Sequence, residues 1–190
     1  MSIDVPNTLK ALWGAIFVLW AISGFTSKRT VSTQGGWRGR APLWGVWLGW
    51  FLLFNNGSNL GLLNARFVPD TPAIAFTGLA LTIVGLVFAL WARVYIGRDW
   101  SAGVTLQEGH KIARTGPYAI VRHPIYSGFM LATLGTAIAL GRIAGFVGTA
   151  LVMGAWGYKS RMEERFLIEN FGAEYEQYRR NVKGLIPFVW

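Results

Sequence analysis

The chain has 190 residues, of which 53% are hydrophobic and only 14% are charged. A soluble domain usually carries about 25% charged residues, so the composition excludes an ordinary water-soluble domain and indicates lipid as the solvent. The net charge of +9 comes from residues scattered over the predicted loops, which argues against nucleic-acid binding, and the absence of cysteine excludes disulfides, thiolate catalysis and cysteine metal sites.

Five apolar segments follow one another along the chain, and each approaches or exceeds the about 20 residues that a helix needs to cross a bilayer. They lie at roughly Leu9–Phe25, Pro42–Leu63, Pro72–Ile96, Pro124–Leu140 and Ile143–Tyr158. Because lipid offers the backbone no hydrogen bonds, these segments are expected to be helices. The sequence therefore predicts an all-α, polytopic integral membrane protein with about five transmembrane helices. Residues 1–190 form one membrane domain, with a two-helix N-terminal region (1–66) and a core (72–190).

The second segment is interrupted by polar residues. They stand in FNNGSNLG (54–61), at Asn55, Asn56, Ser58 and Asn59. Such side chains are unusual at membrane depth, where they either hydrogen-bond between helices or line a path for a substrate. We favour hydrogen bonding between helices.

The last two segments are separated only by Gly141 and Arg142, which predicts a tight antiparallel hairpin. Small residues in the hairpin are expected to let its helices approach closely. They are Gly128, Gly135, Gly145, Gly148, Gly154 and Gly157. Both segments are short, so the sequence leaves open whether the hairpin crosses the bilayer completely.

A charged and aromatic segment begins at Lys159. Apolar and aromatic residues recur in it at spacings of three or four, as on one helix face: Leu167, Phe171, Tyr175, Tyr178 and Val182. Gly172 is expected to break the segment into two short helices. An amphipathic helix lying on the headgroups accounts for this composition without any further function.

Lysine and arginine are distributed unequally between the two predicted sides. Fifteen of the eighteen fall on one side, at Lys28, Arg29, Arg38, Arg40, Arg93, Arg98, Lys111, Arg114, Arg122, Lys159, Arg161, Arg165, Arg179, Arg180 and Lys183. The other side has Lys10, Arg66 and Arg142. The positive-inside rule therefore places the 97–123 loop and the C-terminal segment in the cytoplasm, and the start of the chain outside. In a bacterium this membrane would be the inner membrane.

Two polar clusters flank the hairpin. Arg122 and His123 precede it, and Glu163 and Glu164 follow it, so a hairpin brings them together in space. One interpretation is a set of ion pairs that only staples the hairpin. The other is a ligand site, because aromatic faces attract cations and arginine pairs with carboxylates in a two-bonded fork.

The motif GPYAIVRHPIYSG (116–128) is followed by the hairpin, by EERFLIENFGAEYEQYRRNV (163–182) and by LIPF (185–188). This order and spacing resemble the isoprenylcysteine carboxyl methyltransferase family, to which membrane phospholipid methyltransferases are related. WARVYIGRDWS (91–101) also resembles the end of the helix that precedes the motif in that family. The resemblance covers about residues 91–187, and the first two segments carry no such signature.

The resemblance implies that S-adenosyl-L-methionine binds in a cytoplasmic pocket between the hairpin and the C-terminal segment. Carried over residue by residue, the cofactor site comprises Gly116, Pro117, Tyr118, His123, Pro124, Tyr126, Gly128, Glu163, Glu164, Leu185 and Pro187. Arg122 belongs to the same motif and is a candidate anchor for an anionic group. The chain has no Rossmann glycine fingerprint.

Methyl transfer to an ionised carboxylate needs mainly positioning and desolvation. Transfer to an amine or thiol also requires a base, for which His123, Glu163 and Glu164 are candidates. An arginine would orient a carboxylate acceptor, and we expect this to be Arg93, with Arg165 as the alternative. Arg93 is equally explained as a residue that snorkels to the interface. The catalytic candidates are therefore Arg93, Arg122, Glu163 and Glu164.

The acceptor is expected to be lipophilic and to enter from the bilayer, with membrane lipids as the other partners. A carboxylate acceptor is favoured, and a phospholipid or small-molecule N- or S-methyltransferase is the alternative. Two other classes stay open. Membrane sterol reductases have a similar C-terminal motif and use NADPH, and a non-catalytic membrane protein would use the polar cluster only for stability. No metal site and no oligomeric state are predicted.

Overall fold

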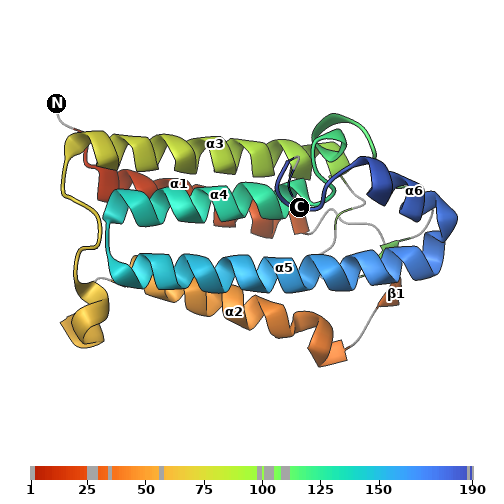
Figure 1. Cartoon of the computed structure of the whole chain (residues 1–190), viewed down its shortest axis with the longest axis horizontal. Coiled ribbons are helices and arrows are strands. Elements are labelled where there is room, and N and C mark those ends of the chain that lie inside the picture. Colours follow the sequence, from red (N-terminus) through yellow and green to blue (C-terminus); the bar gives the residue numbers. More distant parts are fainter. Residues whose placement is uncertain are drawn as a thin grey trace.

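The computed structural model describes the chain except residues 1–2, 25–29, 34–35, 56–57, 98–99, 101–104, 108–111, 188 and 190. Among the described residues, five long helices lie side by side along one axis (Figure 1). They are α1 (Val5–Gly24), α2 (Gly36–Phe54), α3 (Pro72–Ile96), α4 (Pro124–Leu140) and α5 (Ile143–Phe171). The shorter elements are β1 (Thr30–Thr33), η1 (Ser58–Asn64), β2 (Thr105–Gln107), η3 (Gly116–Ala119) and α6 (Ala173–Asn181).

The predicted bounds of α3 and α4 are confirmed, because both helices have strong local start and stop signals. Each begins with a proline, whose missing N–H is harmless in the first helical turn. Thr71 caps α3, its side chain accepting a hydrogen bond from the backbone N–H of Ile74 at 3.4 Å. Gly141 ends α4 in the left-handed region, at φ 69°.

Two other predicted helix bounds are wrong. α5 continues past Tyr158 to Phe171, so the residues after Lys159 extend the hairpin helix and do not start a separate one. The prediction followed hydropathy, whereas helix formation is also favoured by the Lys, Arg, Met and Glu residues there. α2 ends at Phe54, before the polar stretch. Of that stretch, Asn56 lies outside the described residues, and the side chains of Ser58 and Asn59 are not described either.

Two short strands accompany the helices. β1 pairs with β2 in a two-stranded antiparallel sheet, in which Thr33 lies opposite Thr105. The sequence predicted helices only, and the sheet is a small addition to an architecture that is otherwise helical as predicted. It joins the connection after α1 to the connection after α3.

Glycines of α4 and α5 let these helices approach other helices until the backbones are in contact. The closest contacts are with α3 and α2, and not between α4 and α5. A Cβ at Gly135 would lie 2.5 Å from the backbone nitrogen of Thr82 in α3, and Gly128 faces Gly85 and Ala89 of the same helix. Gly148 in α5 meets Gly49 in α2. The hairpin partners α4 and α5 have a looser contact, in which a Cβ at Gly145 would lie 3.4 Å from Ala137. The predicted close approach therefore occurs mainly between α3 and α4 and between α2 and α5.

We expect Gly135→Ala to lower the unfolding free energy by about 1–3 kcal/mol, because the added methyl group must push the backbones of α3 and α4 apart. The matched control is Gly154→Ala, since a Cβ at Gly154 would meet no atom of the described residues. This control should be neutral or stabilising by about 0.5–1 kcal/mol, because alanine favours the helix. Thermal unfolding in detergent, followed by circular dichroism, compares them. Equal melting temperatures would contradict the close contact.

Three hydrogen-bonded side chains form a polar network inside the apolar core. The Trp13 indole Nε1 donates to Thr136 Oγ1 at 3.0 Å, and Thr136 lies 3.1 Å from Thr82 Oγ1. All three side chains are buried. These hydrogen bonds link α1, α4 and α3. Polar side chains form interhelical hydrogen bonds of this type in an apolar medium.

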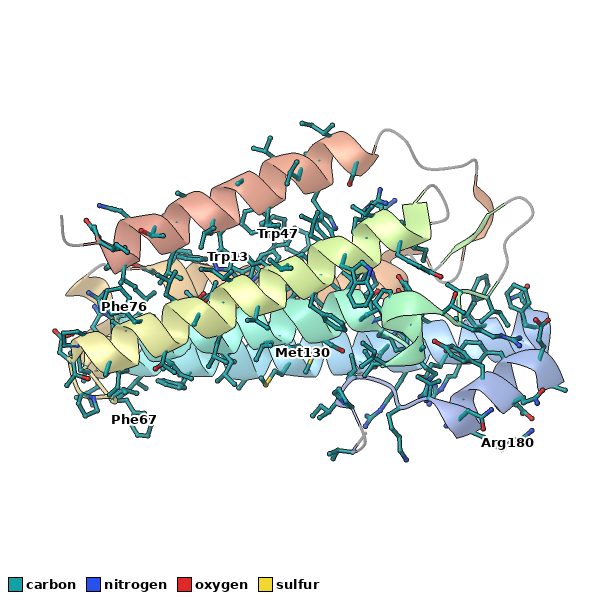
Figure 2. All side chains as sticks on the ribbon, turned by 90° about the horizontal axis from the view of Figure 1, so that it is seen from above. Trp13, Trp47, Phe67, Phe76, Met130 and Arg180 are labelled. Atoms are coloured by element: carbon teal, nitrogen blue, oxygen red, sulfur yellow. The ribbon has the colours of Figure 1, made fainter. Side chains whose placement is uncertain are left out.

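The helices alternate in direction, so their connections gather at two ends (Figure 1). α6, with Arg180, lies at one end, and Phe67 and Phe76 lie at the other (Figure 2). The division agrees with the predicted two-sided distribution of basic residues for those that the structure describes; Lys28, Arg29, Arg98 and Lys111 lie outside the described residues. Among the described residues, α1 and α3 are long and apolar enough to cross a membrane by themselves, and α4 is a shorter apolar helix. The N-terminal region (1–66) contacts the core, since α1 packs on α3 and α2 packs on α5. Its division from the core (72–190) stays a prediction.

Candidate active site

A loop and a C-terminal segment meet at the basic end of the bundle. η3 leads into α4, and the backbone there pairs with residues 183–185. The N–H of Arg122 donates to the carbonyl of Lys183 at 2.8 Å, and the N–H of His123 donates to that of Gly184 at 3.0 Å. The Ser127 hydroxyl donates to the carbonyl of Leu185 at 2.6 Å. The C-terminal segment therefore docks directly on the start of α4.

Arg122 forms the centre of this junction. Its Nε and Nη2 lie 2.9 and 2.6 Å from Glu164 Oε1. Its Nη1 donates to the carbonyls of Arg179, at 3.1 Å, and Val182. The predicted meeting of the two clusters is thus confirmed. These contacts also show that Arg122 holds the C-terminal segment, as expected of a staple.

His123 lies between the two carboxylates. Its Nε2 is 3.2 Å from Glu164 Oε1, and its Nδ1 is 3.5 Å from Glu163 Oε2. The backbone around His123 is fixed by the bond to Gly184 and by Pro124 at the start of α4. The imidazole therefore bridges both acidic residues from a buried position.

Glu163 has a second set of partners. The Tyr126 hydroxyl donates to its Oε1 at 2.5 Å, and the Lys159 ammonium lies 3.5 Å from the same oxygen. Lys159 was not predicted as a site residue. Its position four residues before Glu163 on one helix was the available signal, because such pairs share a helix face.

Aromatic rings continue from the polar cluster into the core. The His123 and Tyr126 rings are parallel within 4°, with centroids 5.6 Å apart. Tyr126 stacks on Trp156 at 4.4 Å and 10°. The Trp156 indole Nε1 is buried and lacks a hydrogen-bond partner among the residues that the structure describes. Trp156 was also missed, since it is one of ten tryptophans in the sequence and nothing local distinguishes it.

The ion pairs shift the acidities of the cluster. Burial alone would raise the pKa of Glu164, but hydrogen bonds and charge from His123 and Arg122 outweigh it and lower the pKa to about 2. Burial would likewise raise the pKa of Glu163, but Lys159, His123 and Tyr126 lower it. Burial disfavours charged His123, yet the two carboxylates raise its pKa overall. Both glutamates are therefore ionised near neutral pH, and they favour the charged form of His123.

These shifts predict how stability depends on pH. The pKa of Glu164 is lower in the folded state, so its stabilisation is present above its unfolded pKa and is lost as the pH falls toward about 2. The pKa of His123 is higher in the folded state, so its stabilisation is present below about 6.5 and is lost as the pH rises through the folded value. The free energy of unfolding in detergent should therefore fall both at acid pH and at alkaline pH. Glu164→Gln should flatten the acid limb and His123→Gln the alkaline limb, whereas Glu169→Gln, on the exposed face of α5, should leave both unchanged.

A pocket of about 260 Å³ opens beside the cluster. Its charged lining contains the carboxylate of Glu164 and four cationic side chains, and its remaining lining comes from Ser160 and the C-terminal segment. The residues are Arg122, Ser160, Arg161, Glu164, Arg179, Lys183, Gly184, Leu185 and Val189. A pocket with both signs of charge suits a ligand that carries both an anionic and a cationic group.

Other predicted site residues have mainly packing contacts. Gly116 (φ 59°) lies against the Tyr95 ring, and Gly128 lies against α3. Tyr118 is buried beside Pro117, and its carbonyl accepts a hydrogen bond from Tyr178 at 2.6 Å. The cofactor roles of these residues and of Pro124 and Pro187 stay predictions, and Leu185 alone of this group lines the pocket.

Arg93 is buried in the last turn of α3 and does not line the pocket. Its guanidinium donates to the carbonyls of Gly97 and Ser23, both at 2.7 Å, and its Cζ is 4.5 Å from the centroid of the Trp100 ring. Within the described residues it has no carboxylate partner, and its Nε lacks a hydrogen-bond partner. Arg93 is buried, so simple snorkelling into water does not describe it.

Comparison with known proteins adds independent information. A family model described as phospholipid methyltransferase matches residues 73–174, more than half of the chain. A probable protein-S-isoprenylcysteine O-methyltransferase from Oryza sativa subsp. indica is 34% identical over 121 residues, covering 61% of this chain and 62% of that protein. The protein-S-isoprenylcysteine O-methyltransferase of Schizosaccharomyces pombe is 35% identical over 134 residues, covering 67% of this chain and 54% of that protein. These similarities confirm the predicted resemblance, although the chain spans less than two thirds of the length of these relatives.

A solved structure is similar as well. The eukaryotic intramembrane Ras methyltransferase, isoprenylcysteine carboxyl methyltransferase, matches with a TM-score of 0.55 at 24% identity, over 84% of this chain and 55% of that one. This likeness concerns the fold. It supports the predicted helical membrane architecture of this chain.

Proposed function

Because the chain belongs to the phospholipid methyltransferase family, we propose that it is an integral membrane methyltransferase that uses S-adenosyl-L-methionine. The observation that carries the proposal is the pairing of Glu163 and Glu164 with Arg122, His123 and Tyr126, beside a pocket with both signs of charge. The cluster lies at the end of the helical bundle that carries α6, just beyond the apolar stretch of α5.

The chemistry of the pocket fits this cofactor. S-adenosyl-L-methionine has a carboxylate, an ammonium group and a sulfonium centre. Arg179 and Lys183 would hold the carboxylate, and Glu164 would face the cationic groups. The stacked rings of Tyr126 and Trp156 offer faces that attract an onium centre. When bound, the cofactor supplies an electrophilic methyl group.

The protein's own part in the reaction is to position the methyl donor and the acceptor and to exclude water from the site. Arg122 and His123 fix the two carboxylates, and the docked C-terminal segment covers the start of α4. An ionised carboxylate acceptor needs no base, so alignment and desolvation account for most of the expected acceleration. Arg93 would orient that carboxylate, which is supported by its burial without a carboxylate partner among the described residues.

The acceptor that we propose is a lipophilic carboxylate of the prenylcysteine type, reaching the site from the bilayer. The names of the relatives favour it. The second candidate is a phospholipid amine, which the name of the matching family favours. For an amine, His123 or one of the glutamates would have to accept a proton.

The test compares cofactors first and acceptors second. We expect S-adenosyl-L-methionine to raise the melting temperature of the protein in detergent and NADPH to leave it unchanged. Stabilisation by NADPH would instead support a membrane reductase, and no shift with either ligand would support a non-catalytic protein. The protein is then incubated with S-adenosyl-L-methionine labelled in its methyl group and with either a farnesylcysteine analogue or phosphatidylethanolamine as the acceptor. A base-labile ester identifies carboxylate transfer, and a base-stable product identifies N-methylation.

The proposed site is cytoplasmic, and reporter fusions test its sidedness. Fusions at Arg66 and Arg142 should report an external position. These paired residues lie in the connections before α3 and between α4 and α5, at the end of the bundle opposite α6 (Figure 1). Fusions at Arg38, Lys111 and Trp190 should report an internal one; Lys111 and Trp190 lie outside the described residues. An internal signal at Arg142 would show that the hairpin does not cross the membrane, and would contradict five spans.

A further inference from the structure

Lys159 is a buried cation where the apolar stretch of α5 ends. Its side chain is 3% exposed. The ammonium nitrogen lies 5.3 Å from the centroid of the Tyr126 ring and 5.4 Å from that of Trp156. It also lies 3.5 Å from Glu163 Oε1. The rings of Tyr126 and Trp156 and the carboxylate of Glu163 are thus close neighbours of the Lys159 ammonium.

These three groups form a cation site, which we call the cage: Tyr126, Trp156 and Glu163. Aromatic faces attract cations more strongly when water is excluded, and a carboxylate adds direct charge pairing. The cage is rigid, since Tyr126 stacks on Trp156 at 4.4 Å and its hydroxyl is bonded to Glu163. Such a site suits any onium group, of which the lysine ammonium is one.

We propose that Lys159 is the resident cation of the cage and that its charge sets the preference of the site between the charged methyl donor and its neutral product. The inference rests on the proposed function, and it assigns Lys159 as a specificity-determining residue. Ser160 and Glu164, which directly follow Lys159 and Glu163 in α5, line the pocket, so the cage lies next to the pocket along this helix. A sulfonium bound in the pocket beside Glu164 would therefore lie near the ammonium of Lys159.

The charge balance of methyl transfer gives the direction of the effect. The carbon–sulfur bond breaks with its electron pair left on sulfur, so a sulfonium becomes a neutral thioether, while a lone pair of the acceptor forms the new bond to carbon. A fixed ammonium nearby repels the sulfonium and not the thioether. Lys159 therefore weakens binding of S-adenosyl-L-methionine relative to S-adenosyl-L-homocysteine, and this favours the reaction on the protein, since only the donor is destabilised.

A purely structural role predicts a different result. If Lys159 only fixes Glu163, as pairs four residues apart on a helix do, its removal disturbs the site for both nucleosides alike. The two ligands differ at sulfur by one methyl group and one charge. The ratio of their dissociation constants therefore separates an electrostatic role from a structural one.

The experiment is calorimetric titration of detergent-solubilised protein with each nucleoside separately. Lys159→Met removes the charge and keeps an unbranched side chain that packs well against aromatic rings. We expect the affinity ratio to shift toward S-adenosyl-L-methionine on the order of tenfold, as for the loss of one nearby like charge in a partly buried site. The control Arg180→Met removes an equal charge from the exposed face of α6 and should leave the ratio unchanged.

Two further variants fix the interpretation. Lys159→Arg keeps the charge and should keep the wild-type ratio. Lys159→Gln replaces Lys159→Met if the latter does not fold, and should shift the ratio in the same direction. An unchanged ratio in the neutral variants, or an equal loss of affinity for both nucleosides, would overturn the assignment of Lys159 while leaving the proposed function intact. Failure of the wild-type protein to bind either nucleoside would overturn the proposed function and, with it, this inference.

Discussion

Replacing Glu164 with glutamine is expected to be the most damaging single change in the site. Its carboxylate pairs with Arg122 and His123 and lies 3.5 Å from Arg179, so the variant leaves a largely buried arginine without its counter-charge. Removing one partner of a buried pair typically destabilises a protein by about 3–5 kcal/mol. A cofactor role alone would leave the fold intact in this variant, and the contacts of Arg122 with the C-terminal segment show why the fold is affected as well.

The same variant should bind S-adenosyl-L-methionine at least about tenfold more weakly in its folded fraction, because one facing carboxylate is lost. Glu163→Gln should weaken binding with a smaller loss of stability, since Glu163 does not hold the C-terminal segment. Glu169→Gln is the matched control on the exposed face of α5. Titration calorimetry and thermal unfolding measure the two effects. Wild-type affinity in both Glu163→Gln and Glu164→Gln would show that the cofactor site is assigned wrongly.

The second large effect is expected at His123 and Tyr126. His123→Ala removes the group that bridges both carboxylates, and Tyr126→Ala removes a hydrogen bond to Glu163 and the centre of the ring stack. We expect each to weaken cofactor binding by about 1–3 kcal/mol, as for the loss of a buried hydrogen bond. Most of the stability should remain in the His123 variant, because the backbone bond from residue 123 to Gly184 persists there.

Affinity and stability must be measured separately to interpret these variants. Calorimetric titration of the folded fraction gives the first, and an unfolding curve gives the second. Tyr158→Ala is a control for the loss of an aromatic residue, since Tyr158 is exposed on the same helix as Trp156. A much lower melting temperature with unchanged cofactor affinity would show that the cluster only staples the hairpin.

Several features of this molecule could be predicted from local signals. α3 and α4 have prolines at their starts and glycines at their ends, so their bounds follow from backbone chemistry. The meeting of Arg122 with Glu164 was also predictable, because two residues between apolar helices force an antiparallel hairpin. These features need no knowledge of distant regions of the chain.

The remaining features depend on distant contacts. β1 and β2 are only four and three residues long, and their pairing joins connections that are far apart in the sequence. Lys159 counts as one more basic residue of the C-terminal segment until Tyr126 and Trp156 are placed around it. Hydropathy shows which residues suit the membrane interior, and it does not show where a helix ends. It could therefore not predict that α5 continues to Phe171.

The pairing of Arg122 and His123 with residues 183–184 has a consequence for biosynthesis. The Arg122 side chain bonds to a carbonyl sixty residues later in the chain. At the usual rate of translation, about 5–20 residues per second, that partner is made roughly 3–12 s after the loop. During this delay Arg122 lacks its carbonyl partner in the C-terminal segment, although Glu164 is made earlier. The active site is therefore expected to be assembled late, after the helices have been inserted, and a nascent chain stalled before residue 182 should be inserted but unable to bind the cofactor.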